Sequence, residues 1–442
     1  MKTNDLDLAV DPPARIAVIG AGPIGLESAL YARFLGYSVC VLEKGRVADH
    51  VRRWGHVRMF SPFAMNHSPL GLAALEAQNT HYRPPSPDAY LTGDQWADAY
   101  LMPLAESDLL ADCIREQAHV TDIARFGCTK GAYWNDPASR AEFPFLIRYE
   151  DRSGEEQTVE ADVVIDASGV YHCPKWIGPG GMPAAGERLC RSRITYHLPD
   201  VEGTEREAFA GQRVLVVGSG YSAATTVVSL AKLAEQAPGT AVVWLTRLRP
   251  GQQEPIPRFA PDPLPERDGL AEAANRIARG HPAVEHLPGW WIETVAWNDN
   301  HFLVTLKEPS DQESSHDTAA RKEVRAFDRI VANVGYRPDT GLFRELHVHQ
   351  CYATEGPIRL AARLLGENTT DCLAVGAAGG EALVTTEPHF YIVGSKSYGR
   401  LSHFLYQNGL KQIRDIFAII GGRAGLDLYK TVQPAKKSTT VL

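Results

Sequence analysis

The sequence predicts an α/β protein with two domains, each built on a parallel β-sheet, in which the second domain is inserted into the first. Three observations predict this fold class. A strand, a glycine-rich turn, a helix and a second strand follow one another at residues 15–43. The same succession returns at residues 213–245, and the strand-then-small-residue pattern of 163–169 returns at 330–339. The distance between the two turns suits two successive domains rather than a short structural repeat.

The composition is that of a soluble globular chain. Of its 442 residues, 44% are hydrophobic and 22% are charged, so there is ample material for a core. The net charge is -8, whereas a nucleic-acid-binding protein normally carries a basic excess. No apolar run approaches 18 residues, and the polar N-terminal segment does not resemble a signal peptide. We therefore expect a cytoplasmic protein with neither nucleic acid nor membrane as a partner.

The first glycine turn has the order of elements that a dinucleotide site needs. The apolar strand at 15–19 leads into G-A-G-P-I-G at 20–25, and a helix at 26–36 is followed by a strand at 39–42 that ends on Glu43. The first glycine allows the tight turn, the second lets the backbone approach a pyrophosphate, and the third lets helix and strand pack closely. The pyrophosphate then lies at the helix N-terminus, and the acid faces the ribose. The residues assigned to this site are Gly20, Gly22, Pro23, Ile24, Gly25, Glu43 and Lys44.

The second glycine turn differs at the ribose position. G-S-G-Y-S-A at 218–223 follows the strand at 213–217 and precedes a helix at 224–233 and a strand at 241–245. An arginine, Arg247, stands after that strand in place of an acid, which favours a ribose with a 2′-phosphate and therefore NADPH. A solvated basic strand end is the alternative. The residues assigned to this site are Gly218, Gly220, Tyr221, Ser222 and Arg247.

The remaining segments divide the chain into domains. We expect a helical stretch at 93–118, a strand pair around 145–149, and a connection rich in Pro, Gly and charge at 174–212. Residues 309–323 read as a polar loop or disordered insert. The expected division is a loose leader at 1–14, a split first domain at 15–200 and 330–431, an inserted second domain at 205–329, and a loose tail at 432–442.

Over nearly all of its length the chain resembles the two-dinucleotide-binding-domain flavoproteins, which include glutathione and thioredoxin reductases and the flavin-containing monooxygenases. A-S-G at 167–169 and V-G-Y-R-P-D at 334–339 look like the paired crossover segments of that family. The resemblance implies two Rossmann-like domains, with FAD in the first site and NADPH in the second. It also places Ser168, Gly169 and Gly335 next to a cofactor.

The last predicted strand and helix also fit the resemblance. A strand at 390–394 precedes a helix at about 401–420, and in the family this helix points its N-terminus at the flavin. Here Gly394, Ser395 and Lys396 stand where the family has a Gly-Asp pair. Gly394 and Ser395 are assigned to the flavin site. The serine and lysine either bind a flavin phosphate or belong to a surface loop.

The cysteines separate this chain from the family's disulfide reductases. There are seven, none forms a CxxC or CxxxxC pair, and none forms a group with histidine at zinc-ligand spacing, so we expect no metal site. Disulfide reductases of the family need two closely spaced cysteines at the flavin. Without them, the reduced flavin must pass its electrons to oxygen, to an organic substrate or to a protein partner.

The resemblance to the monooxygenase branch leads to our main functional expectation. We expect a small-molecule substrate and O₂ as partners, with N- or S-oxygenation of a soft nucleophile through a flavin C4a-hydroperoxide. Two branch motifs are incomplete: only His197 remains of FxGxxxH, and GGxW becomes R-W-G-H at 53–56. This departure weakens a Baeyer–Villiger assignment most. Trp54 packs either on the flavin edge or in the core.

Other functions remain open from the sequence. The first alternative is an NADPH-dependent flavin reductase that passes electrons to a protein or quinone, and the second is a non-catalytic redox sensor that binds both nucleotides. His56 and His197 are the candidate catalytic residues, although a histidine is more often a hydrogen-bonded structural residue. A homodimer is compatible with the fold, and the sequence does not fix the oligomeric state.

Overall fold

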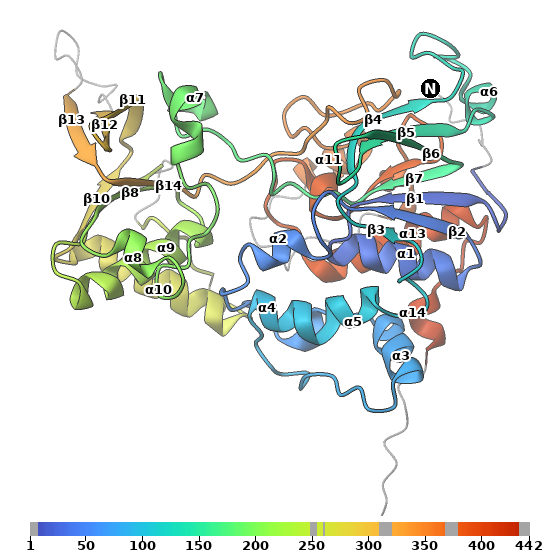
Figure 1. Ribbon diagram of the computed structural model, residues 1–442, viewed down its shortest axis with the longest axis horizontal. Coiled ribbons are helices and arrows are strands. Elements are labelled where there is room, and N and C mark those ends of the chain that lie inside the picture. The colour runs from blue at the N-terminus through green and yellow to red at the C-terminus, as the bar shows by residue number, and fades with distance from the viewer. Residues whose placement is uncertain (1–7, 248–253, 260, 309–320, 367–378, 433–442) are drawn as a thin grey trace, which may run out of the picture. The chain divides into compact units, whose positions relative to one another are not determined.

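The structure, a computed structural model, describes residues 8–247, 254–259, 261–308, 321–366 and 379–432 (Figure 1). The chain divides into two compact units. The first unit contains residues 1–55, 61–173 and 337–442, and the second contains 56–60 and 174–336. The predicted fold class, two Rossmann-like domains with the second inserted into the first, is confirmed.

The first unit is built on a five-stranded parallel sheet. Its strand order is β15 (Phe390–Ile392), β7 (Val163–Asp166), β1 (Arg15–Ile19), β2 (Ser38–Leu42) and β3 (Ile114–Arg115). All neighbouring strands run parallel. The central strands carry hardly any exposed side chain, as expected for a parallel sheet covered on both faces.

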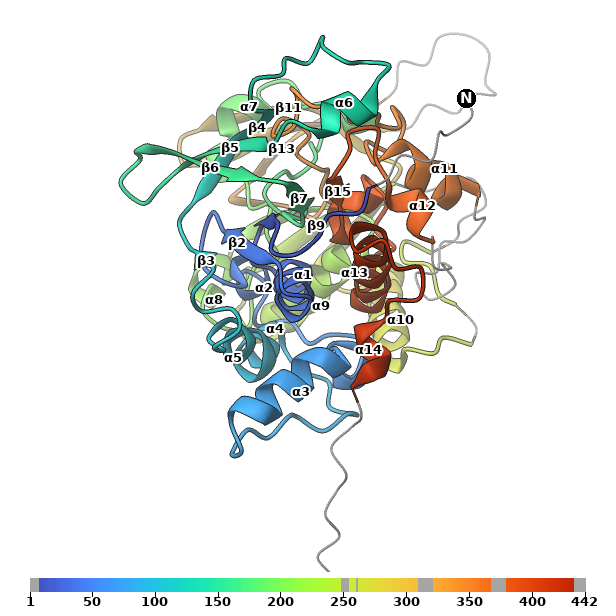
Figure 2. The same ribbon diagram turned by 90° about the vertical axis from the view of Figure 1, so that its right-hand side faces the viewer.

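Two layers cover this sheet. Helices α1 (Pro23–Phe34) and α13 (Tyr406–Ile420) lie on one face, where Tyr31 and Phe417 stack with ring centroids 5.1 Å apart (Figures 1 and 2). An antiparallel sheet covers the other face, with β5 between β4 and β6. Its strands are β4 (His119–Arg125), β5 (Phe145–Glu150) and β6 (Glu156–Ala161). A buried cluster fills the space between the two sheets and includes Ala17, Ile19, Ile123, Ile147 and Phe390.

The second unit repeats this plan. Its parallel sheet has the order β10 (Val284–Pro288), β9 (Ala241–Thr246), β8 (Arg213–Val217) and β14 (Arg329–Ala332). This order matches β3-β2-β1-β7 of the first unit, so each glycine turn leaves the corresponding strand of its own sheet.

The second sheet is also covered on both faces. Helices α9 (Tyr221–Gln236) and α10 (Pro265–Gly280) pack together beside it, and Val227, Leu230 and Ala274 belong to the core on that side. The three-stranded antiparallel sheet of β11, β12 and β13 packs on the other core, with Leu215 and Val304. The strand bounds are Trp291–Asn298, His301–Lys307 and Lys322–Phe327.

The prediction of a helical stretch at 93–118 is wrong for its second half. Helix α4 (Gly93–Trp96), the π-helical turn η2 (Ala97–Leu101) and α5 (Met102–Ala105) run on from one another, and the helix ends there. The Ser107 hydroxyl donates to the carbonyl of Leu104 at this end. The next residues turn so that β3 can pair with β2, because sheet pairing outweighs local helical periodicity.

Short elements complete the described chain. They are α2 (Asp49–Arg52), η1 (Phe63–Met65), α3 (Pro69–Gln78), α6 (Pro137–Ala141), η3 (Pro179–Gly181), α7 (Glu187–Cys190), η4 (Arg191–Arg193), α8 (Arg206–Phe209), α11 (Ile358–Gly366), α12 (Gly380–Leu383), η5 (Gly394–Tyr398) and α14 (Leu428–Thr431).

The boundaries between the two compact units differ from the domain boundaries that the sequence predicts. The first boundary lies after Cys173 rather than near 200, because two isolated bridges, Ala185 to Thr294 and Thr195 to Val331, join the intervening residues to the second unit. Residues 337 onward belong to the first unit, whereas the sequence predicted a return at 330.

Three segments expected to be loose lie partly outside the described residues, namely 1–7, 309–320 and 433–442. Within the described part of the leader, Val10 is held in place, which corrects the expectation there. Its N–H donates to the carbonyl of Ile420, and its own carbonyl accepts from the Tyr37 hydroxyl. Among the described helices, none has the length and apolarity to cross a bilayer.

Candidate cofactor-binding sites

The first glycine turn shows a different steric situation at each glycine. Gly20 has a φ of +97°, a conformation that favours glycine. A methyl group on Gly25 would lie 1.9 Å from the carbonyl oxygen of Gly20, so helix α1 can approach the turn only with glycine there. A methyl group on Gly22, the N-cap residue of α1, would meet nothing within 4 Å. This middle position therefore faces open space at the helix N-terminus, where an anion is favoured.

The Glu43 side chain accepts hydrogen bonds from the backbone at and near the same turn. One carboxylate oxygen accepts the N–H of Ala21 and the other accepts the N–H of Gly45, both at 2.7 Å. Burial raises the pKa of Glu43, and these two hydrogen bonds oppose that rise. Each oxygen keeps lone pairs for further donors, as a ribose contact would need.

The C-terminal segment packs on the start of helix α1. Ile24 touches both Gly394 and Gly409, and a methyl group on Gly409 would lie 2.2 Å from the Cδ1 atom of Ile24. The N–H of Gly394 donates to the side chain of Gln412 in α13. Helix α13 begins at Tyr406 rather than near 401. The last helix therefore packs beside the first glycine turn, and the expectation that its N-terminus points at a flavin stays a prediction.

Lys396 has a role that the sequence did not predict. Its ammonium group is buried and forms a 2.6 Å ion pair with Asp166, at the end of β7. It also donates to the hydroxyl of Ser168, which in turn donates to Asp166. The surface-loop reading of this lysine is therefore wrong, whereas its role as a phosphate ligand stays a prediction. Ser395 lies next to Gly169, whose φ is +69°.

Trp54 and Lys44 have different surroundings. The half-buried Trp54 packs on Gly93 at the start of α4, where a methyl group would lie 2.8 Å from the indole ring. Lys44 is exposed and lines an open depression together with Gln117 and His119. Neither position decides between a cofactor contact and a structural role.

In the second glycine turn, too, one glycine is crowded by the backbone and the middle glycine is open. A methyl group on Gly218 would lie 2.3 Å from the carbonyl oxygen of Asn333, whereas one on Gly220 would meet nothing within 4 Å. Gly220 is the N-cap residue of α9, and Ala223 is fully buried at the third position. An open backbone position therefore again lies at a helix N-terminus.

Arg247 follows β9 beside this turn. Its side chain is exposed, and its backbone N–H donates to the hydroxyl of Ser219 within the turn at 2.8 Å. Ser222 is exposed on the first turn of α9. Tyr221 packs edge-to-face with Phe60. The backbone of Arg247 is thus tied to the turn that would hold the pyrophosphate, while its guanidinium is exposed. Gly335, the remaining residue assigned to a cofactor, adopts a φ of +79°.

The two candidate catalytic histidines are both exposed. His56 lies in the short segment that belongs to the second unit. His197 lies 3.3 Å from the carboxylate of Glu205, as in an ordinary surface pair. No contact of either histidine points to a reacting group, so their catalytic roles stay predictions.

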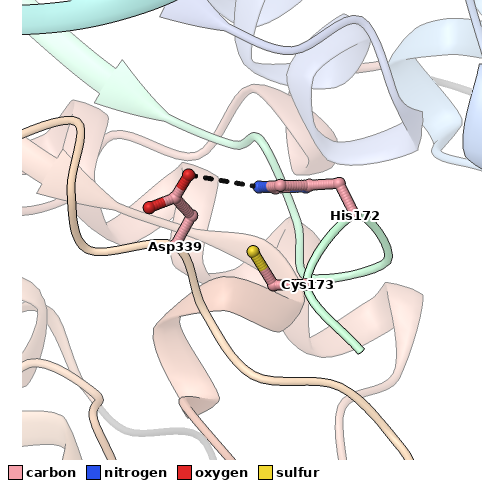
Figure 3. A group of neighbouring side chains, drawn as sticks. All are labelled: His172, Cys173 and Asp339. Carbon is pink, nitrogen blue, oxygen red and sulfur yellow. Dashed lines mark ion pairs between the residues drawn. The ribbon is translucent and has the colours of Figure 1, made fainter. Parts of the chain in front are cut away.

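A third group of residues is brought together by the fold alone. His172 and Cys173 follow β7, and Asp339 follows the second connection, yet their ligand atoms all lie within 4.8 Å of one another (Figure 3). Burial alone would lower the pKa of His172, but hydrogen bonds with Asp339 and Cys173 raise it to about 9. The expected absence of a metal site stays a prediction, but these three side chains are close enough to be ligands of one ion. Sequence spacing misses this group because Asp339 lies far along the chain.

Two further cysteines become neighbours through the sheet. Cys40 lies in β2 and Cys113 precedes β3, and the carbonyl of Cys113 accepts the N–H of Val41. Burial raises the pKa of both thiols, that of Cys113 to about 11. Both therefore stay protonated near neutral pH, which makes them poor nucleophiles for disulfide exchange.

Residues 17–130 match the family model described as pyridine nucleotide-disulphide oxidoreductase. A curated relative, 3-(3-hydroxy-phenyl)propionate/3-hydroxycinnamic acid hydroxylase from Paraburkholderia xenovorans (strain LB400), is 29% identical over 180 residues. The aligned part covers 35% of this chain and 26% of the relative, so the chain spans about a quarter of that protein's length.

Solved structures share the fold over most of the chain. The bacillithiol disulfide reductase of Bacillus cereus is 16% identical with a TM-score of 0.62, and the match covers 92% of this chain and 99% of that one. A cadaverine monooxygenase from Erwinia amylovora, solved bound to FAD, is 14% identical with a TM-score of 0.61, over 97% and 98%. The ornithine N-hydroxylase of Kutzneria sp. 744 is 15% identical with a TM-score of 0.57, over 92% and 99%. Residues 17–130 are thus similar to the pyridine nucleotide-disulphide oxidoreductase family, and most of the chain shares the two-domain fold of these solved structures.

Proposed function

We propose that the chain is an FAD-dependent, NADPH-consuming monooxygenase that oxygenates a small soft nucleophile such as an amine, thiol or thioether. The observation that carries this proposal is the pair of glycine turns. Each has an open middle glycine at a helix N-terminus, Gly22 in one and Gly220 in the other. Two such sites in one chain suit a pair of dinucleotides that exchange electrons.

The residues of the first turn fit FAD. The open space at Gly22 admits a pyrophosphate to the N–H groups and positive dipole end of α1, and Glu43 is held at the ribose side. Gly394 and Gly409 of the neighbouring C-terminal segment pack against Ile24. The cofactor would supply the redox chemistry, by accepting a hydride and reacting with oxygen, and this chain's residues would bind it and orient it.

The residues of the second turn fit NADPH. Gly220 leaves room for the pyrophosphate at α9, and the exposed Arg247 beside the turn suits a 2′-phosphate. Because arginine can bind a phosphate through two parallel hydrogen bonds, it discriminates against a plain ribose. We therefore assign NADPH rather than NADH as the electron donor.

The choice of monooxygenase rests on the cysteines and on the relatives together. The fold includes both disulfide reductases and monooxygenases, so it does not decide the reaction. The sequence has no closely spaced cysteine pair, and the neighbouring thiols of the half-buried Cys40 and the buried Cys113 both have raised pKa values. A hydroxylase, a cadaverine monooxygenase and an ornithine N-hydroxylase are among the similar proteins, in agreement with oxygen as the electron acceptor.

The test is turnover with and without oxygen. The purified protein should be yellow and should consume NADPH in air, faster when an amine, thiol or thioether substrate is added, with one oxygenated product per NADPH consumed. NADPH consumption should stop under nitrogen after a single flavin reduction. Sustained consumption under nitrogen with a quinone or an electron-carrier protein would instead support the reductase.

A further inference from the structure

The two segments that connect the units run side by side. The N–H of Arg337 donates to the carbonyl of Cys173, and the N–H of Lys175 donates to the carbonyl of Gly335. Between them, Pro174 and Tyr336 form an antiparallel bridge. The segments therefore form a short two-stranded ribbon, and residues far apart in the sequence face each other at its first-unit end.

Three side chains of different ligand chemistry meet there. Nε2 of His172 lies 3.7 Å from Oδ2 of Asp339, and Sγ of Cys173 lies within 4.8 Å of both groups (Figure 3). All three residues are half-buried. Two of them come from one connecting segment and the third from the other, so backbone pairing of the ribbon fixes their proximity.

Neighbouring groups hold two of these side chains in orientation. Oδ1 of Asp339 accepts the N–H of Gly341 at 2.9 Å, which leaves Oδ2 turned toward His172. The His172 ring stacks on that of His50, with centroids 5.9 Å apart and an interplanar angle of 16°. Such supporting contacts characterise metal ligands in proteins, because they fix the ligand before the metal arrives.

We propose that His172, Cys173 and Asp339 bind a Zn²⁺ ion through one imidazole nitrogen, one thiolate and one carboxylate oxygen, with water in a fourth position. Zinc accepts this donor set in tetrahedral geometry, and its bond lengths place ligand atoms roughly 3.2–3.8 Å apart. The present separations of up to 4.8 Å therefore require only small side-chain rotations. Binding needs the thiol as a thiolate and the ring as a neutral imidazole, so the affinity for the metal depends on pH.

The charges of the surroundings suit a divalent cation. A thiolate and a carboxylate together carry the two negative charges that neutralise Zn²⁺. The nearby ammonium group of Lys396 would repel the ion if it were unpaired, but it forms a 2.6 Å ion pair with Asp166. Zinc bound here would join the two connecting segments through side chains, and it does so whether or not the proposed oxygenation is correct.

The first experiment measures metal binding to the full chain with its flavin. Co²⁺ is added to chelator-treated protein and followed by its d–d absorption beyond the flavin bands, and Zn²⁺ is then titrated in competition. We expect one tetrahedral Co²⁺ per chain, displaced by one Zn²⁺. Cys173→Ser and Asp339→Asn should each weaken binding by about tenfold or more. Cys351→Ser, which changes another thiol of the same unit, should leave the titration unchanged.

The second experiment locates the metal by thiol protection. Zn²⁺ should slow alkylation of Cys173, measured by mass spectrometry of its peptide, and should leave alkylation of Cys351 unaffected. Both readouts are independent of turnover, so they stand if the proposed function fails. Equal Co²⁺ binding by the parent and by a folded, flavin-loaded Cys173→Ser protein would overturn the assignment. Absence of Co²⁺ binding, or unprotected Cys173 at saturating Zn²⁺, would also overturn it.

Discussion

At the residue scale, the glycines of each turn have separable functions. Gly25 and Gly218 are required by packing, because a methyl group would overlap a backbone oxygen. Gly22 and Gly220 are not, because a methyl group there meets nothing, and their backbone angles suit any residue. A side chain at these two positions should therefore affect the ligand and not the fold.

Gly22→Val should yield a folded protein without flavin. The valine side chain extends into the space that the pyrophosphate needs, whereas the protein itself leaves that space free. Flavin content by absorbance should fall about tenfold or more, with an unchanged far-ultraviolet circular dichroism spectrum. A yellow Gly22→Val protein with full flavin content would show that FAD does not bind at this turn.

The Asp166–Lys396 pair predicts a stability effect. Lys396→Met leaves the Asp166 carboxylate buried without its counterion, which costs about 3–5 kcal/mol for such pairs. The thermal unfolding midpoint should fall accordingly. Combining Lys396→Met with Asp166→Asn removes the unpaired carboxylate charge, so the double variant should recover part of the lost stability. A double variant as unstable as the sum of the single variants would contradict this account.

Arg247 predicts a cofactor preference. Arg247→Ala should raise the KM for NADPH about tenfold or more, since a charge-assisted contact to phosphate is worth about 1.5–3 kcal/mol. The KM for NADH should change little, because NADH has no 2′-phosphate. Equal effects on both nucleotides would instead assign Arg247 to a feature that the two share.

At the element scale, the sequence predicts what glycine and apolar periodicity determine locally. The strands β1, β2, β8 and β9 and the helices between them lie where the pattern places them, because turn, helix and strand are adjacent in the chain. Pairing between distant segments is not visible in this way. The loss of helix after Ala105, the burial of Lys396 and the approach of Asp339 to His172 all depend on partners far along the sequence.

The buried carboxyl of Glu27 connects several elements. Its Oε1 atom on α1 accepts hydrogen bonds from Tyr100 of η2 at 2.6 Å and from Tyr406 of α13 at 3.1 Å. Burial raises the pKa of Glu27 above its ordinary value of 4.5, and the hydrogen bonds from Tyr100 and Tyr406 oppose the rise. The folded state therefore holds this proton more tightly than the unfolded chain does.

This shift predicts a pH dependence with a definite sign. A raised pKa in the folded state contributes stability that is present below pH 4.5 and is lost as the pH rises through the folded value. Glu27→Gln removes that loss, so its melting temperature relative to the parent should rise from pH 4.5 to 8. The exposed Glu207→Gln should show no such trend. A constant difference between Glu27→Gln and the parent would mean that Glu27 does not titrate differently on folding.

At the scale of the whole molecule, four strands of each unit's parallel sheet have the same order and each unit has an open glycine, but the residues that follow the second strand carry opposite charges. Glu43 follows β2 and Arg247 follows β9. If each site takes one cofactor, damage to one site should be separable from damage to the other.

Gly220→Val tests whether each of the two sites takes its own cofactor. A methyl group on Gly220 would meet nothing within 4 Å, and this residue lies in the second unit. The variant should therefore fold and keep its full flavin content. NADPH should then reduce that flavin at least about tenfold more slowly in an anaerobic stopped-flow experiment, since the blocked site is the one proposed for the donor. Dithionite needs no nucleotide site and should reduce the flavin at the parent rate. Unchanged reduction by NADPH would mean that the donor reaches the flavin without the second glycine turn, and loss of the flavin itself would mean that the two sites are not independent.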